Sequence, residues 1–310
     1  MNTSINTALH DIIGNGEPVV SVAPVELNAP DRLLPLQVRV SAPNSGSDLP
    51  VIVLSHGNGW SLDGYAPLAN FWASRGFVVV QPTHLDSRRH GIGFDHPAFP
   101  NIWRQRIVDV KCILDQLDSV EEALPGLSGR VDRTRIAAVG HSWGGQTAQA
   151  LLGARVLDTN GEAGEVFTDS RIAAGVLLAT TGTGEQLAPF AREHLAFMNP
   201  SFAELRTPTL VVAGDRDQSA MSSRGPDWFT DAYALSPGAT DLLTLFGGEH
   251  GLGGIVGYEV AETTDENPER VAVVQRMTTA YLRSALDPSD NGWSEAKSAL
   301  PESVGSVDSK

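Results

Sequence analysis

Ser142 stands in a sequence that is typical of a catalytic nucleophile. Glycines flank it at Gly140 and Gly144, an apolar run over 135–139 precedes it, and a helical pattern over 143–156 follows. In the order strand, sharp turn, helix, G-x-S-x-G presents the serine hydroxyl at the end of a sheet. The N–H groups at the start of the helix then face any oxyanion that forms there. We therefore predict Ser142 as a nucleophile. The alternative is a bystander serine in a glycine-rich turn.

A serine hydroxyl reacts at neutral pH only when a base takes its proton and a third group orients that base. In this architecture the three groups follow in the order serine, acid, histidine. The chain offers Ser142, then Asp215 or Asp217, then His250, each after an apolar run. We predict Asp217 as the acid, because it lies three residues after Gly214, and keep Asp215 as the alternative. The other aspartate would then bond its own backbone in the turn.

Acyl transfer also needs donors for the developing oxyanion. The backbone N–H of Trp143, directly after the nucleophile, is the first candidate. The loop after the apolar run 51–55 should supply the second, from Asn58 or, failing that, Gly59. Aromatic side chains and a loop glycine are candidates for an apolar substrate pocket. Each aromatic ring except that of Trp143, which the turn at Ser142 fixes in place, could instead belong to the core. The candidates are Gly59, Trp60, Trp103, Trp143, Phe197 and Trp228.

One loop raises the question of a metal site. It holds five potential ligands, namely His84, Asp86, His90, Asp95 and His96. Their spacing matches no zinc pattern, and two arginines lie among them, so we predict a polar loop and no metal. His141 is expected to be a turn residue whose ring packs or bonds locally.

An α/β fold would position these residues. Short apolar runs at 51–55, 77–80, 135–139, 172–179, 209–213 and 241–246 alternate with helical segments. Strands that are buried on both faces have continuous apolar sequences of this kind. Their alternation with helices predicts a mostly parallel sheet of about eight strands with helices on both faces. Residues 18–27 and 34–41 alternate apolar and polar side chains and are expected to pair antiparallel at one edge.

The sequence predicts a single domain. We expect residues 1–17 to be a flexible lead-in, residues 18–286 the α/β domain, and residues 180–207 a small cap within it. Residues 287–310 are polar and are expected to form a weakly held tail.

Composition excludes several classes of protein. The 310 residues carry a net charge of −15, which argues against a nucleic-acid partner, and no apolar run is long enough for a membrane span. A single cysteine, Cys112, precludes an internal disulfide. The first residues lack a basic start followed by an apolar core, so we expect a cytoplasmic protein. A secreted form after signal removal fits the same sequence, and the oligomeric state is open.

Together these residues resemble the α/β-hydrolase superfamily over roughly residues 18–286. Within it, the chain is similar to bacterial chlorophyllase-like, platelet-activating-factor-acetylhydrolase-like and dienelactone-hydrolase-like esterases. The segments that carry the resemblance are Ser55-His56-Gly57-Asn58-Gly59, Gln81-Pro82-Thr83-His84-Leu85-Asp86-Ser87, Trp103-Arg104-Gln105-Arg106-Ile107-Val108-Asp109 and Gly140-His141-Ser142-Trp143-Gly144-Gly145.

The resemblance implies a cofactor-free serine hydrolase with Ser142, Asp217 and His250 as its triad. It also implies that the loop around His84–Asp86 lines or braces the site. With the aromatic candidates for the pocket wall, we expect hydrolysis of apolar or aromatic small-molecule esters through an acyl-serine. Lactones, amides or polyesters are alternatives with the same triad. Polyester-degrading relatives are usually secreted with disulfides, which this chain lacks. A non-catalytic ligand-binding protein on this fold is the remaining alternative.

Overall fold

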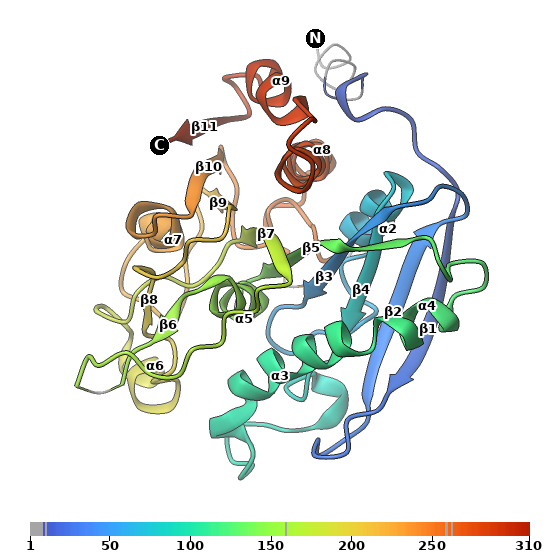
Figure 1. Cartoon of the computed structure of the whole chain (residues 1–310). Coiled ribbons are helices and arrows are strands. Elements are labelled where there is room, and N and C mark those ends of the chain that lie inside the picture. Colours follow the sequence, from blue (N-terminus) through green and yellow to red (C-terminus); the bar gives the residue numbers. More distant parts are fainter. Residues whose placement is uncertain (1–8, 10, 159, 258–259, 262) are drawn as a thin grey trace.

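A nine-stranded sheet organises the part of the chain that the computed structural model describes, which is residues 9, 11–158, 160–257, 260–261 and 263–310 (Figure 1). The strands are β1 (Val19–Leu27), β2 (Leu36–Pro43), β3 (Leu49–Ser55), β4 (Val78–Pro82), β5 (Val131–His141), β6 (Arg155–Val156), β7 (Ile172–Leu178), β8 (Pro200–Ser201), β9 (Thr209–Gly214), β10 (Ala239–Leu245) and β11 (Gly305–Ser309). The α-helices are α2 (Ala66–Ser74), α3 (Ile102–Asp115), α4 (Leu117–Ala123), α5 (Trp143–Leu152), α6 (Pro189–His194), α7 (Asp231–Leu235), α8 (Pro268–Leu286) and α9 (Gly292–Ala299).

The strand order in the main sheet is β1-β2-β4-β3-β5-β7-β9-β10-β11. From β4 to β10 neighbouring strands are parallel, whereas β1, β2 and β11 pair antiparallel at the two edges. Helices α2 and α8 cover one face, and α3 and α5 the other (Figure 1). The predicted fold class is confirmed. Because parallel strands end at the same edge, the loops after β3, β5, β9 and β10 gather there.

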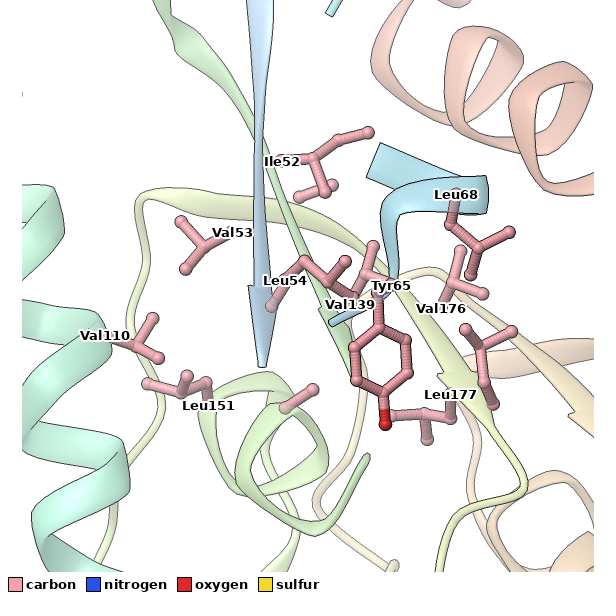
Figure 2. Packing of buried hydrophobic residues seen from close by; sticks show 14 of the residues in the cluster. Ile52, Val53, Leu54, Tyr65, Leu68, Val110, Val139, Leu151, Val176 and Leu177 are labelled. Carbon is pink, nitrogen blue, oxygen red and sulfur yellow. The ribbon is translucent and has the colours of Figure 1, made fainter. Parts of the chain in front are cut away.

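The core explains why the central strands read as continuous apolar runs. Successive side chains of β3 point to opposite faces, and helices cover both faces. Figure 2 shows Val53 on the side of Val110 from α3 and Leu151 from α5, with Ile52 on the side of Leu68 from α2. All five side chains are buried.

The C-terminal segment differs from the expected tail. Residues after 286 form α9 and β11, and β11 extends the sheet beside β10 (Figure 1). Trp293 and Ala296 of α9 are buried, and Lys297 contacts Asp241 of β10 at 3.2 Å. The segment is polar because it lies at an edge, where backbone pairing and a few buried side chains suffice to hold it.

The N-terminal lead-in also contributes to the core where it is described. Leu9 and Ile13 are buried, and Arg283 of α8 donates to the Ile13 carbonyl at 2.8 Å. Residues 1–8 and 10 lie outside the described part of the chain.

The segment 180–207 contains α6 and β8, and β8 pairs with β6 in a separate two-stranded sheet. Its first residues, Thr180 and Thr181, are buried. A role for this segment as a cap stays a prediction. In the described part of the chain, no helix combines the length and apolarity needed to cross a membrane.

Candidate active site

The turn at Ser142 has the geometry expected of a nucleophile elbow. β5 ends at His141, α5 begins at Trp143, and Ser142 between them has φ 55°, in the left-handed region that a side chain normally avoids. A Cβ atom on Gly140 would lie 1.9 Å from the carbonyl oxygen of Gly144. Glycine is therefore required for the close approach of strand and helix, and the turn presents the serine at the edge where the parallel strands end.

The structure brings Ser142, His250 and Asp217 together. Nε2 of His250 lies 2.9 Å from Ser142 Oγ, and its Nδ1 lies 3.0 and 3.1 Å from the two carboxylate oxygens of Asp217. An ionised carboxylate can only accept, so Nδ1 carries the proton. Nε2 is then free to accept the hydroxyl hydrogen of Ser142, which is the arrangement that general-base activation requires.

The two candidate acids have different environments. Asp217 is fully buried, and burial raises the pKa of its carboxyl above the ordinary value, opposed by the contact with His250. Asp215 instead accepts the backbone N–H of Gly247 at 2.6 Å and is exposed. The geometry thus places Asp217, and not Asp215, against the histidine.

A second aspartate, Asp265, holds the loop that carries His250. Its Oδ2 accepts the backbone N–H groups of Glu249 at 2.9 Å and Gly253 at 3.1 Å. Arg270 on α8 pairs with the same carboxylate at 2.9 Å. The sequence analysis did not identify Asp265, because no spacing links a loop aspartate to a histidine fifteen residues earlier.

The loop after β3 contains the candidates for the second oxyanion donor. The N–H of Gly57 donates to the Tyr65 hydroxyl at 2.9 Å, and the N–H of Gly59 donates to Asp86 at 3.2 Å. Both amides next to Asn58 are therefore already used, which argues against Gly59 as the donor and leaves Asn58 as the candidate.

Trp143 supplies the other candidate donor. It is the first residue of α5, so its N–H has no acceptor within the helix. The positive end of the helix dipole adds to its ability to stabilise negative charge beside Ser142.

A buried ion pair braces the loop after β3. Arg106 of α3 forms two bonds to Asp86, at 2.9 and 2.6 Å, and donates to the carbonyls of His56 at 2.7 Å and Gly57 at 3.3 Å. Burial opposes ionisation of Asp86, yet Arg106 holds the pKa of this carboxyl well below its usual range. This pair explains how the loop around His84–Asp86 contributes to the site.

The ring nitrogens of His84 both have protein partners. Nε2 lies 2.9 Å from Ser55 Oγ, and Nδ1 lies 2.8 Å from Asp109, which also pairs with Arg32. Burial and then Arg106 lower the pKa of His84. Within the described residues, no group of three His, Cys, Asp or Glu side chains is arranged to hold a metal ion.

A groove of about 1040 Å³ lies between α3, the loop before α3, residues within 156–165 and residues within 184–199. Two predicted pocket residues, Trp103 and Phe197, line it and stack with ring centres 5.9 Å apart. Phe197 also meets Trp143 edge to face at 5.6 Å. Phe94 and Phe99 complete the aromatic wall, and sequence reasoning did not select either.

The remaining predicted pocket residues are placed differently. Trp228 is 1% exposed and donates to the Thr183 carbonyl at 2.9 Å, so it packs in the core and does not line the groove. Its neighbour Phe229 instead contacts the His250 ring, with centres 5.5 Å apart. Trp60 is half-buried, with the Arg88 guanidinium 5.5 Å from its ring centre, and is also outside the groove.

Comparison with known proteins agrees with this architecture. The profile of the alpha/beta hydrolase family matches residues 52–298, well over half of the chain. No curated protein gives a significant match. The matched region runs from β3 into α9 and contains Ser142, Asp217 and His250. On this match, the chain belongs to the alpha/beta hydrolase family.

Proposed function

We propose that this protein is a serine hydrolase that cleaves carboxylic esters through an acyl-serine intermediate. One observation carries the proposal. The His250 ring contacts Ser142 Oγ through Nε2 and Asp217 through Nδ1, at 2.9 and 3.0 Å. A histidine held in this way between a hydroxyl and a carboxylate is a base already oriented toward a nucleophile.

Acylation would begin with attack of Ser142 Oγ on the ester carbonyl carbon, while its proton moves to His250 Nε2. Asp217 would stabilise the imidazolium, and the N–H groups of Trp143 and Asn58 would donate to the oxyanion. Collapse of the tetrahedral intermediate breaks the bond to the alkoxy oxygen. That oxygen takes the proton from His250 and leaves as the alcohol.

Deacylation would repeat these steps with water. His250 takes a proton from the water molecule, whose oxygen attacks the acyl-serine carbonyl. Collapse then breaks the bond to Ser142 Oγ, which regains its proton from His250, and the carboxylic acid departs. His250 relays each proton in this scheme, first from Ser142 to the alkoxy oxygen and then from water back to Ser142.

The groove supports apolar or aromatic esters as substrates. Its wall contains Phe94, Phe99, Trp103 and Phe197, and Phe197 touches the ring of Trp143, next to the nucleophile. Aromatic walls favour apolar acyl or alcohol groups. Membership of the chlorophyllase-like, platelet-activating-factor-acetylhydrolase-like or dienelactone-hydrolase-like branch, and a cytoplasmic location, stay predictions.

A matched substrate panel tests the bond that is cleaved. We would compare kcat/KM for an aryl ester, the corresponding cyclic aryl lactone and the corresponding anilide, with wild type and with Ser142→Ala. We expect the ester to be preferred and all turnover to be lost in the variant. A preference for the lactone or the anilide would contradict the ester assignment while leaving the role of Ser142 intact.

A further inference from the structure

A series of buried hydrogen bonds connects two loops, the loop after β3 that contains Asn58 (the oxyanion loop) and the loop after β10 that carries His250 (the His250 loop). The connection runs through His141, the residue before Ser142. The N–H of Gly57 donates to the Tyr65 hydroxyl at 2.9 Å, and this hydroxyl lies 2.8 Å from Nδ1 of His141. Nε2 of His141 lies 2.8 Å from the backbone carbonyl oxygen of His250. Three segments far apart in the sequence therefore meet in one connected series.

The direction of each bond in this series is fixed by its ends. The N–H of Gly57 can only donate, and the carbonyl of His250 can only accept. His141 must therefore carry its hydrogen on Nε2, and its bare Nδ1 accepts the Tyr65 hydroxyl hydrogen. For the neutral imidazole, this is the single tautomer that satisfies both ends. Burial lowers the pKa of His141 to about 3, so the ring stays neutral.

Tyr65 is held at both of its ends. Its side chain is fully buried, and Figure 2 shows the ring packed among core side chains with the hydroxyl oxygen at its tip. Its backbone has φ 63°, a left-handed conformation that costs a non-glycine residue energy. Its N–H donates at 2.7 Å to the carbonyl of Val256, in the segment that follows His250. Strain of this kind persists only where the surroundings enforce it.

We propose that Tyr65 and His141 are positioning residues that hold the oxyanion loop and the His250 loop in a fixed position relative to each other. This inference rests on the proposed function. Neither side chain needs to touch the substrate. Each acts through another group: Tyr65 through the Gly57 amide next to Asn58, and His141 through the backbone of the base. A misplacement of about 1 Å between such groups can cost about a hundredfold in rate.

Tyr65→Phe is the most direct test, because it removes one oxygen from a buried ring and leaves the rest of the side chain. Tyr281→Phe is the matched control, since Tyr281 is also buried but packs against Trp293 of α9. We expect kcat for an aryl ester to fall about 10- to 100-fold in Tyr65→Phe with KM little changed, and both constants to stay near wild type in Tyr281→Phe. An unchanged kcat in a folded Tyr65→Phe protein would overturn the proposal.

His141 variants test the same series if Tyr65→Phe does not fold. The amide of His141→Gln can still donate toward the His250 carbonyl, whereas His141→Leu has a similar volume and no donor. We expect His141→Gln to keep at least several-fold more of the wild-type kcat than His141→Leu. Equal activity of the two variants would contradict a role through the His250 carbonyl.

Ring-nitrogen NMR of histidine-labelled protein gives a readout that does not depend on turnover. Wild type should show His141 with hydrogen on Nε2, and Tyr65→Phe should shift the ring signals of both His141 and His250. A fluorophosphonate labelling rate, measured alongside, separates the two claims. No labelling of wild type would contradict the proposed function, and the NMR shifts would then decide the positioning role. Unchanged His250 signals in Tyr65→Phe would overturn that role.

Discussion

Asp217 and His250 lie on loops that follow the neighbouring parallel strands β9 and β10, and Oδ2 of Asp217 is 3.0 Å from Nδ1 of His250. Asp215, two residues earlier, accepts the Gly247 amide at the end of β10 instead. The same turn therefore holds one aspartate against the base and uses the other to join two loops.

This difference makes Asp217→Asn and Asp215→Asn a matched pair. An amide at position 217 favours the wrong tautomer of His250, so we expect kcat to fall about 10³- to 10⁴-fold. Asp215→Asn should stay within a few-fold of wild type, because its carboxylate does not contact the histidine. Steady-state kinetics on an aryl ester would measure both. Equal losses in the two variants would contradict the assignment of the acid.

The buried pair of Asp86 and Arg106 should be important for stability as well as for activity. Asp86→Asn leaves the Arg106 guanidinium buried without a counter-charge, so we expect the free energy of unfolding to fall by about 3–5 kcal/mol. Asp95→Asn, an exposed position on the same loop, is the control. Urea denaturation would measure both changes. The double variant Asp86→Asn/Arg106→Gln should regain part of the loss, and full additivity of the two single effects would argue against a coupled pair.

His141 should make stability depend on pH. Its folded-state pKa of about 3 lies below the unfolded value of 6.5, so the unfolded chain binds an extra proton between these values. The free energy of unfolding should therefore fall as the pH drops, by about 1.4 kcal/mol from His141 alone between about pH 7.5 and about pH 5.5.

Denaturant titrations at the two pH values would measure this loss. His141→Gln should show a smaller decrease than wild type, while His194→Gln, at an exposed histidine, should not differ from wild type. Identical decreases in wild type and His141→Gln would contradict the buried neutral state of His141.

The groove should determine the preference for substrate size. Phe197→Ala removes an aromatic wall, and the lost apolar contact of about 1.5–3 kcal/mol should lower kcat/KM for a long-chain or aromatic ester about 10- to 100-fold. The acetate ester should be affected much less. Phe71→Ala, on α2 and away from the groove, is the control. A uniform loss across all chain lengths in Phe197→Ala would indicate damage to the fold instead of a substrate contact.

Much of the fold could be predicted because buried parallel strands have a distinctive sequence. Runs such as 51–55 and 209–213 are apolar throughout, since helices cover both faces of the sheet. The positions of Ser142, Asp217 and His250 followed from the same pattern, because each comes after such a run. β11 gave no signal of this kind. Only Val307 among its residues is apolar, and pairing with β10 holds it.

The supporting residues could not be predicted in the same way. Tyr65 and Arg106 act through contacts between segments far apart in the chain, and Asp265 acts through contacts within the loop that follows β10 and with the start of α8. No local spacing encodes these contacts. The sequence led to Trp228, and not Phe229, being predicted as a site residue, for a related reason. Both are aromatic residues in a short helical turn, and only the packed structure determines which ring faces the histidine.

The most direct measurement is the mass of the covalent adduct formed with a fluorophosphonate by wild type, Ser142→Ala and His250→Ala. We predict one adduct per wild-type molecule, mapped by peptide mass to Ser142, no adduct in Ser142→Ala, and labelling slowed by orders of magnitude in His250→Ala. A folded wild-type protein that stays unlabelled, or that is labelled at another residue and equally well in Ser142→Ala, would contradict the account of Ser142 as an activated nucleophile.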